Sequence, residues 1–200
     1  VAVITGAAHG IGLECARRLA QTHRVALLDL DAEALPGAAA SCGADAIHHV
    51  CDITDGTQVA EAVATVVGEA GGIDVLISNA GVAIQGSMRH LDPDALAAQL
   101  NVNVVGNWRV IHACLPHLEA RRGYVLGVAS AAAIAPQVGL GCYGTSKAGL
   151  EMLLDVLRIE VAHLGVDVGC AYFLWIATDM VTGADREMAA FAAMRRAMRR

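Results

Sequence analysis

The residues best suited to chemistry in this sequence are Tyr143 and Lys147, which stand four positions apart in the run YGTSK. On an α-helix, positions i and i+4 lie one turn apart on the same face. A phenol titrates at about pH 10 and is a poor proton carrier at neutral pH. An ammonium about 4 Å away, at an effective dielectric of about 20, stabilises the phenolate by on the order of 4 kcal/mol, which lowers the pKa of the phenol. The pair therefore predicts a tyrosine that exchanges protons near neutral pH.

A tyrosine and a lysine at this spacing also occur on ordinary helix surfaces, so the interpretation depends on the rest of the chain. Ser130 follows a predicted strand over 123–129 and brings a hydroxyl to the carboxyl end of that strand. The Ala- and Gly-rich connection over 131–142 carries little charge, as a loop facing a substrate would.

A glycine-rich turn stands near the start of the chain. A β-branched run over 1–4 predicts a buried strand, and TGAAHGIG at 5–12 leads into a helical pattern that reaches residue 20. Gly6, Gly10 and Gly12 allow close approach of the backbone, and free N–H groups at a helix start face an anion. This favours a dinucleotide over a strand-to-helix turn without a ligand.

The second predicted strand, over 24–30, carries Asp29 close to its end. A carboxylate at this place would accept hydrogen bonds from the adenosine ribose and repel a 2′-phosphate. Leu30 supplies no compensating cation, so NAD is favoured over NADP. Asp29 could instead be a surface carboxylate that caps a helix over 31–41, although Asp31 could cap that helix equally well.

A third strand is predicted over 44–50, and a helix that reaches residue 70 follows. Asp52 is a candidate contact for the adenine amino group, and Asp55 is a candidate cap for the helix. A metal site is the alternative suggested by His48, His49, Cys51 and Asp52. Successive residues of a strand point to opposite faces, so we expect no metal there.

The fourth predicted strand, over 72–77, ends in Ser78-Asn79-Ala80-Gly81. Small residues and an amide at the carboxyl end of a strand suit a ligand that crosses the sheet, although a plain turn would use the same residues.

A long helix is predicted over 93–115, with Asp92 as its cap and Pro93 in its first turn. Its apolar pattern is interrupted by Asn101, Asn103 and Asn107. Asn is a modest helix former. We therefore expect an asparagine side chain to bond freed backbone at a kink, or an ordered water.

A further helix, over 143–163, is apolar on nearly all sides, so it needs a second cover besides its own sheet. We expect a partner subunit, in a dimer or homotetramer, that contacts the helices over 93–115 and 143–163. A sixth strand is predicted over 166–173. Alternating strands and helices, with ligand-like turns after the strands, predict an α/β fold: one doubly wound parallel sheet with helices on both faces.

Composition agrees with a single domain over 1–200. The chain is 56% hydrophobic and 17% charged, and its net charge of −6 argues against a nucleic-acid surface. Its six cysteines form no C-x-x-C pair, which favours reduced thiols. No apolar run reads as a membrane span and no basic leader is present, so we expect a cytoplasmic protein. We also expect terminal segments to lie outside this sequence.

Taken together, these motifs closely resemble the short-chain dehydrogenase/reductase superfamily, in its common single-domain form, from residue 1 to about 180. The residues that carry the resemblance are TGxxxGIG at 5–12, Asn79-Ala80-Gly81, Asn103, Ser130, and Tyr143 with Lys147. The resemblance implies a Rossmann fold that binds a nicotinamide cofactor.

The resemblance also implies roles for individual residues. Tyr143 would be the acid/base and Lys147 would lower its pKa and hold the nicotinamide ribose, while Ser130 would bond the substrate oxygen. Asn103 would hold a water in a proton relay to Lys147. The implied cofactor contacts are Gly6, Gly10, Ile11, Gly12, Asp29, Asp52, Ile53, Asn79, Ala80, Gly81, Tyr143, Lys147 and Thr178. The segment over 180–200 would belong to a lid over the substrate.

This sequence departs from the family pattern in three places. Ser78 stands where the family usually has Asn, and Leu174-Trp175 replaces the usual Pro-Gly. The family's last strand and its flanking helix have no counterpart in these 200 residues. The first departure leaves the Asn79 motif intact, and the second should change how the nicotinamide end and the substrate are held.

The leading hypothesis is an NAD(H)-dependent oxidoreductase that interconverts a secondary alcohol and a ketone, with a hydrophobic substrate. The alternatives are a dinucleotide-binding scaffold or sensor that has lost the chemistry, and a Rossmann methyltransferase. The methyltransferase hypothesis gives no reason for Ser130, Tyr143 and Lys147 to occur together.

Overall fold

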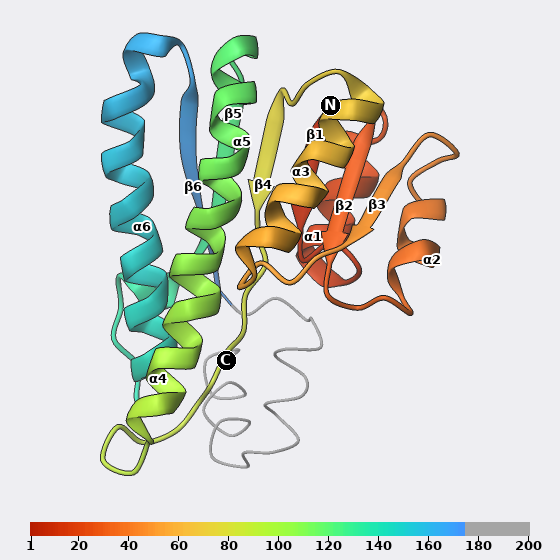
Figure 1. Cartoon of the computed structure of the whole chain (residues 1–200). Helices are drawn as coiled ribbons and strands as arrows, with labels where there is room; N and C mark the ends of the chain where they lie inside the picture. Colours follow the sequence, from red (N-terminus) through yellow and green to blue (C-terminus); the bar gives the residue numbers. More distant parts are fainter. Residues whose placement is uncertain (175–200) are drawn as a thin grey trace.

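A computed structural model describes residues 1–174 as a six-stranded sheet covered by helices (Figure 1). The strands are β1 (Ala2–Thr5), β2 (Val25–Asp29), β3 (Ile47–Val50), β4 (Val75–Ser78), β5 (Tyr124–Ser130) and β6 (Asp167–Phe173). Their order is β3-β2-β1-β4-β5-β6, and every pair is parallel. This is the predicted doubly wound sheet.

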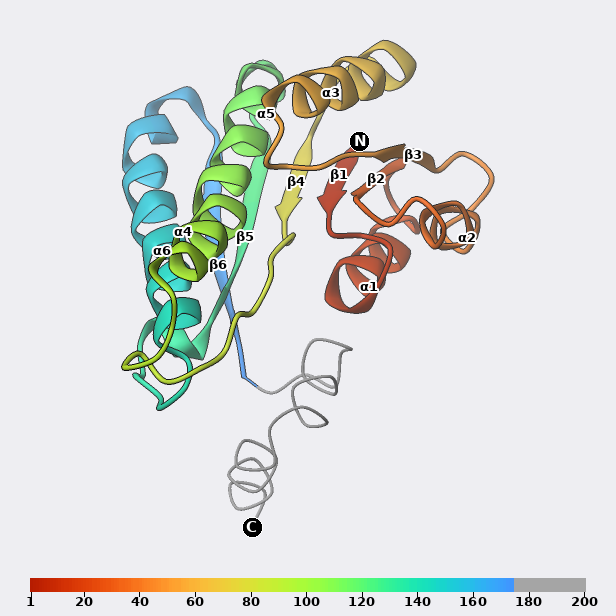
Figure 2. The same ribbon diagram turned by 60° about the horizontal axis from the view of Figure 1, so that its bottom comes forward.

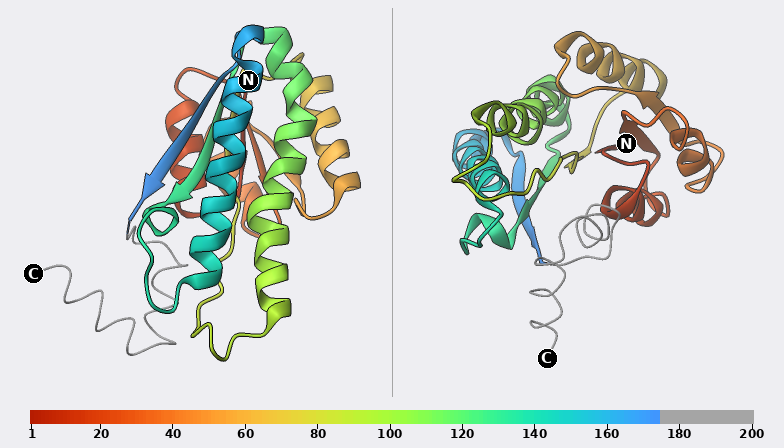
Figure 3. Two further views of the ribbon diagram at one scale, coloured as in Figure 1. Left: turned by 90° about the vertical axis from the view of Figure 1, so that its left-hand side faces the viewer. Right: turned by 90° about the horizontal axis from the view of Figure 1, so that it is seen from below.

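The helices follow the predicted alternation with the strands. They are α1 (Gly10–Leu19), α2 (Leu35–Ala40), α3 (Gly56–Ala70), α4 (Pro93–Leu100), the π-helical η1 (Asn101–Gly106), α5 (Asn107–Arg121) and α6 (Gly141–Val161), with short 3₁₀ turns η2 (Ala131–Ala133) and η3 (Ala162–Leu164). In Figures 2 and 3, α1 and α2 lie on one face of the sheet, and α3, α5 and α6 cover the other.

Two apolar cores form on the two faces because the short strands are apolar on both sides. All four residues of β1 are buried. Val3 and Leu76 belong to the core under α3, α5 and α6, whereas Ile4 and Leu27 belong to the core under α1 and α2. Since all strands are parallel, their carboxyl ends meet at one edge, where the chain order reverses between β1 and β4.

The helix predicted over 93–115 differs from the observed one in two ways. Asp92 accepts a hydrogen bond from Asp94 N, as expected of its cap. The regular helix then gives way to η1 and resumes as α5, which continues past Pro116 to Arg121. The predicted end was therefore too early, and the asparagines mark a local change of helix type.

The helix predicted over 31–41 begins only at Leu35. Asp31 Oδ1 accepts hydrogen bonds from the N–H groups of Glu33 and Ala34, so its side chain closes a turn ahead of the helix. Asp55 does cap α3, accepting from Thr57 N and Gln58 N. Within residues 1–174 no helix is both long and apolar enough to cross a membrane.

Candidate active site

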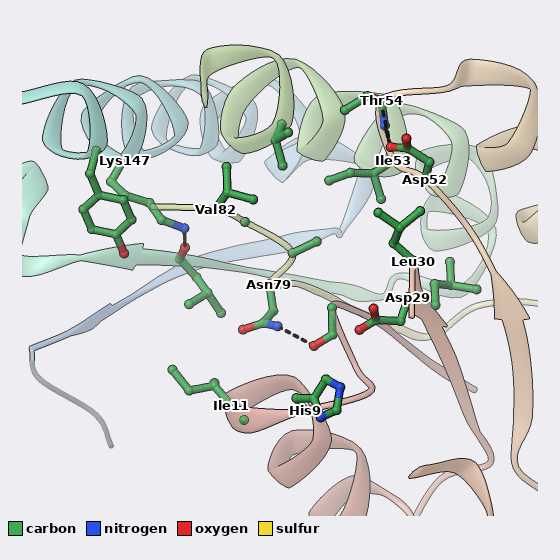
Figure 4. A pocket seen from close by; sticks show the side chains of 18 of the residues that line it. His9, Ile11, Asp29, Leu30, Asp52, Ile53, Thr54, Asn79, Val82 and Lys147 are labelled. Atoms are coloured by element: carbon green, nitrogen blue, oxygen red, sulfur yellow. Dashed lines mark hydrogen bonds between the residues drawn. The ribbon is translucent and has the colours of Figure 1, made fainter. Parts of the chain in front are cut away.

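A cavity of about 620 Å³ lies at the carboxyl edge of the sheet (Figure 4). It runs along the ends of β1, β2 and β4 to the start of α6. The predicted site residues that line it are Gly6, Gly10, Ile11, Asp29, Asp52, Ile53, Asn79, Ala80, Gly81, Tyr143 and Lys147. Residues from separate segments of the chain therefore meet in one place, as the motifs predicted.

The glycine-rich turn has the form that a phosphate group requires. Gly6 and Gly10 have φ angles of 61° and 54°, which favour glycine. A Cβ on Gly12 would lie 2.1 Å from the carbonyl O of Gly6, so the start of α1 packs directly on the turn. The N-cap residue His9 makes no side-chain capping bond, so the first N–H groups of α1 are left for an anion at the cavity. These features fit a dinucleotide pyrophosphate.

Asp29 lies at the carboxyl end of β2 and points into the cavity (Figure 4). Its Oδ2 accepts a 2.8 Å hydrogen bond from Ala8 N, and its Oδ1 accepts one of 3.0 Å from Asp31 N. The carboxylate thus joins the glycine-rich turn to the loop after β2. Leu30 beside it is 65% exposed and offers an apolar side chain to a ligand at this end.

His9 lines the same end of the cavity and was missed as a site residue. Its Nε2 lies 2.9 Å from Asp31 Oδ2, and this bond is the largest cause of the lowered pKa of Asp31. The sequence signal was its place between Ala8 and Gly10, inside the turn.

Asp52, the predicted adenine contact, and Ile53 both line the cavity. Asp52 Oδ1 accepts hydrogen bonds from both the N–H and the hydroxyl of Thr54, which fixes the carboxylate. Thr54 itself lines the cavity and was not predicted. Its spacing of two from an aspartate is the available signal, because such pairs close Asx turns.

Asn79 connects β4 to the glycine-rich turn. Its Nδ2 donates to the carbonyls of Thr5 and Gly6, at 2.9 and 3.0 Å. The hydroxyl of Thr5 accepts from the N–H groups of Asn79 and Ala80, each at 3.0 Å. This set of bonds holds the two strand ends together under the cavity floor.

Tyr143 and Lys147 project from the first turns of α6 into the other end of the cavity. Lys147 Nζ lies 5.8 Å from the centre of the Tyr143 ring and donates a 2.7 Å hydrogen bond to the Val128 carbonyl. Ser130, at the end of β5, lies close enough to Tyr143 to lower the pKa of its phenol. Its hydroxyl donates to the Phe173 carbonyl at 3.4 Å and accepts from Ala132 N at 3.2 Å. The predicted grouping of these three side chains is therefore present.

The expected direction of the Tyr143 pKa is wrong for this structure. Burial raises the pKa of Tyr143, and the neighbouring Ser130 hydroxyl offsets this rise in pKa only in part. Burial also lowers the pKa of Lys147 to about 8, since its ammonium is desolvated. From the sequence we expected the charge of Lys147 to outweigh desolvation, whereas desolvation is the largest influence on both groups.

Asn103 lies behind the cavity wall and is fully buried. Its Oδ1 and Lys147 Nζ would lie 3.1 and 3.4 Å from a Cβ placed on Gly81. The absence of a side chain on Gly81 thus lets the amide oxygen and the lysine both approach its backbone closely.

Asn107 explains two features of the sequence at once. Its Nδ2 donates to the carbonyls of Val102 and Asn103, which belong to the π-helical turn, as expected of an asparagine at a kink. Its Oδ1 accepts a 2.6 Å hydrogen bond from the Ser78 hydroxyl. Ser78 in place of the usual Asn is therefore matched by an amide on the facing helix.

The remaining predicted site residues are not among those that line the cavity. Gly12 and Ser130 support the cavity from behind its lining. Thr178, Trp175 and the lid segment over 180–200 lie outside the described residues.

A model of the short chain dehydrogenase family matches residues 1–189, so the chain belongs to this family. It is 34% identical over 175 residues to the 2-(R)-hydroxypropyl-CoM dehydrogenase of Xanthobacter autotrophicus, covering 83% of this chain and 70% of that protein.

Solved structures of the family superpose closely on this one. The 3-ketoacyl-(acyl-carrier-protein) reductase of Brucella melitensis, complexed with NADH, gives a TM-score of 0.87 at 26% identity, covering 90% of this chain and 78% of that chain. A single-residue variant of actinorhodin polyketide ketoreductase with NADPH gives 0.90 at 28% identity, covering 94% and 75%. The chain is thus an oxidoreductase with a Rossmann fold that binds NAD or NADP.

Proposed function

We propose that this protein is an NAD(H)-dependent oxidoreductase that interconverts a secondary alcohol and a ketone, with Tyr143 as general acid/base. The observation that carries the proposal is the position of the Tyr143 phenol. It shares one cavity with the glycine-rich turn and Asp29, its pKa is lowered by the nearby Ser130, and it lies beside Lys147.

In this proposal the nicotinamide, when bound, supplies or accepts a hydride at the carbinol carbon. Tyr143 then gives or takes the proton on the substrate oxygen. Ser130 donates a hydrogen bond to that oxygen, where negative charge develops. Lys147 holds the nicotinamide ribose, and its ammonium favours the phenolate when the proton leaves.

A relay to Lys147 through a water beside Asn103 completes the proposed catalytic set. The support for it is that Asn103 Oδ1 and Lys147 Nζ both approach the backbone of Gly81 closely. An ordered water needs polar partners of this kind.

The preference for NAD over NADP is also a proposal, supported by Asp29. Its carboxylate would accept bonds from ribose hydroxyls and repel a 2′-phosphate. The similar structures bind NADH or NADPH, so the family alone does not decide between them.

We further propose an uncharged, apolar substrate. The loop between β5 and α6 exposes Ile134 and Val138, the latter at 93% of its surface. A homo-oligomer in the cytoplasm completes the proposal, with α4–α5 and α6 as contact surfaces. Its support is the exposure of Met152 (64%) and Ile159 (77%) on α6, a face without cover among the described residues.

The test is the change in absorbance at 340 nm with NAD or NADP across a panel of secondary alcohols and ketones of increasing apolar size. We expect turnover with NAD and with the larger apolar members. Tight NADH binding without turnover of any alcohol or ketone would reject the enzyme in favour of a dinucleotide-binding scaffold or sensor.

A further inference from the structure

Three buried amide side chains stand at four-residue intervals along the continuous helix formed by α4, η1 and α5. They are Gln99, Asn103 and Asn107, and we refer to them as the amide ladder. Each is at most 1% exposed. Buried amides require partners, since an unpaired one destabilises the fold.

The partners of the amide ladder lie on the chain segment that leaves β4, residues 80–84. Asn107 Nδ2 donates to the Ala80 carbonyl at 2.9 Å. Asn103 accepts from Val82 N at 2.8 Å and donates to the Val82 carbonyl at 2.9 Å.

Gln99 makes the third set of these bonds. Its Oε1 accepts from Ile84 N at 2.7 Å, and its Nε2 donates to the Val82 carbonyl at 3.0 Å. The ladder therefore runs antiparallel to residues 80, 82 and 84.

This pairing works because two repeats agree in length. Four residues of helix rise about 6 Å, and two residues of extended chain advance about 6.6 Å. Side chains at every fourth helical position can therefore reach every second residue of an extended segment. Within residues 1–174, the N–H groups of Val82 and Ile84 have no other recorded hydrogen-bond partner.

The ladder also contacts the turn of α6 that carries Tyr143 and Lys147. Ser146 Oγ accepts from Asn103 Nδ2 at 2.9 Å and from Gln99 Nε2 at 3.5 Å, and it donates to the Tyr143 carbonyl at 2.8 Å. The same two amides thus hold the cavity wall at Val82 and the backbone of the proposed acid/base.

We propose that Gln99 and Asn107 are positioning residues, which with Asn103 set the distance between the segment over 80–84 and the catalytic turn of α6. The catalytic part of this inference rests on the proposed function. Gln99 touches neither cavity nor substrate, and it acts through Val82, Ile84 and Ser146.

The test that does not depend on activity is residue-resolved amide hydrogen exchange. In Gln99→Leu the N–H of Ile84 should lose its protection, because its recorded acceptor is gone, while the N–H of Val82 keeps the acceptor on Asn103. In Asn103→Leu the N–H of Val82 should lose its protection, while the N–H of Ile84 keeps the acceptor on Gln99. Gln99→Asn, whose shortened amide cannot reach Ile84, serves if the leucine variant does not fold.

The kinetic test compares Gln99→Leu with Val110→Ala, which weakens the apolar packing of α5 and leaves all three ladder amides in place. Because a small displacement of catalytic groups slows turnover strongly, we expect kcat to fall about tenfold or more in Gln99→Leu. Its Kd for NADH should change by a smaller factor than its kcat, since the glycine-rich turn and Asp29 lie away from the ladder. At an equal loss of thermal stability, Val110→Ala should keep its kcat.

Unchanged protection of Ile84 in both Gln99 variants would overturn the proposal, and so would an equal loss of kcat in Val110→Ala. A wild-type protein without turnover would reject the proposed function alone, because the exchange pattern still decides the role of the ladder.

Discussion

Lys147 Nζ donates a 2.7 Å hydrogen bond to the carbonyl of Val128, close to the end of β5. Among the described residues, this neutral carbonyl is the hydrogen-bond partner of Lys147, which is only 4% exposed. Desolvation is accordingly the largest cause of its lowered pKa, which lies at about 8. The lysine is therefore held close to its point of titration under mildly alkaline conditions.

The stability of the protein should depend on pH through Lys147. Because the pKa is lower in the folded state than in the unfolded chain, the folded state binds fewer protons between about pH 8 and pH 10.5. The destabilising contribution of the buried ammonium is fully present below about pH 8, and it is relieved as the pH rises above that value.

Lys147→Met removes this contribution, so the variant should be more stable than the wild type at pH 7. Urea unfolding of both proteins from pH 7 to pH 10 measures the difference, which should shrink as the pH rises. A difference that stays constant over this range would contradict the assigned cause.

Tyr143→Phe should lower turnover by roughly 10²–10⁴-fold, because general acid–base catalysis typically contributes that much. Its affinity for NADH should stay within about a factor of two to three, since the pyrophosphate and adenosine contacts remain. Steady-state assays at 340 nm measure turnover, and fluorescence titration measures the affinity for NADH. Tyr172→Phe is the matched control, because the Tyr172 hydroxyl donates to Glu151 away from the cavity.

Asp29→Ala should weaken NAD binding far more than NADP binding, because the change removes the ribose acceptor and the repulsion of a 2′-phosphate together. Titration with both dinucleotides measures the ratio of the two dissociation constants.

Asp29→Asn separates charge from structure in this experiment. The amide oxygen can still accept from Ala8 N, as the carboxylate does now, and only the second bond, from Asp31 N, is lost. This variant should therefore keep the turn but relax the preference for NAD. Equal losses for both dinucleotides in both variants would show that Asp29 serves only the fold.

Gly12→Ala should destabilise the protein by about 1–3 kcal/mol, as overpacking does, and abolish dinucleotide binding. The added Cβ would lie 2.1 Å from the Gly6 carbonyl and 2.7 Å from Asn79 Nδ2. Gly68→Ala is the control, since nothing lies within 4 Å of its Cβ position on α3. The free energy of unfolding of that variant should rise by about 0.5–1 kcal/mol because of helix propensity. Urea unfolding measures the stability of both variants.

Local patterns in the sequence were enough to predict the succession of strands and helices along the chain and the motifs that meet in the cavity. The glycine-rich turn, Asp29, Asn79 and the Tyr143–Lys147 spacing each follow a strand or open a helix, so topology brings them to one edge. The late start of α2 was not predicted, because Asp31 suits a turn and a helix cap equally well.

Other features depend on contacts between distant segments. The three asparagines signalled an irregular helix, but apolar periodicity alone does not reveal a π-helical turn. The raised pKa of Tyr143 follows from burial, and burial is set by tertiary packing. His9 was missed because its bond to Asp31 joins residues from two separate loops.

The hydrogen bond between Ser78 and Asn107 has a consequence for how relatives of this protein should be compared. A comparison that treats each aligned position alone would score Ser78 as the loss of a side-chain amide. Asn107, however, supplies an amide to the same buried contact. We therefore expect the effects of substitutions at the two positions to be coupled. Ancestral reconstruction or library design that varies one of them should therefore vary the other with it.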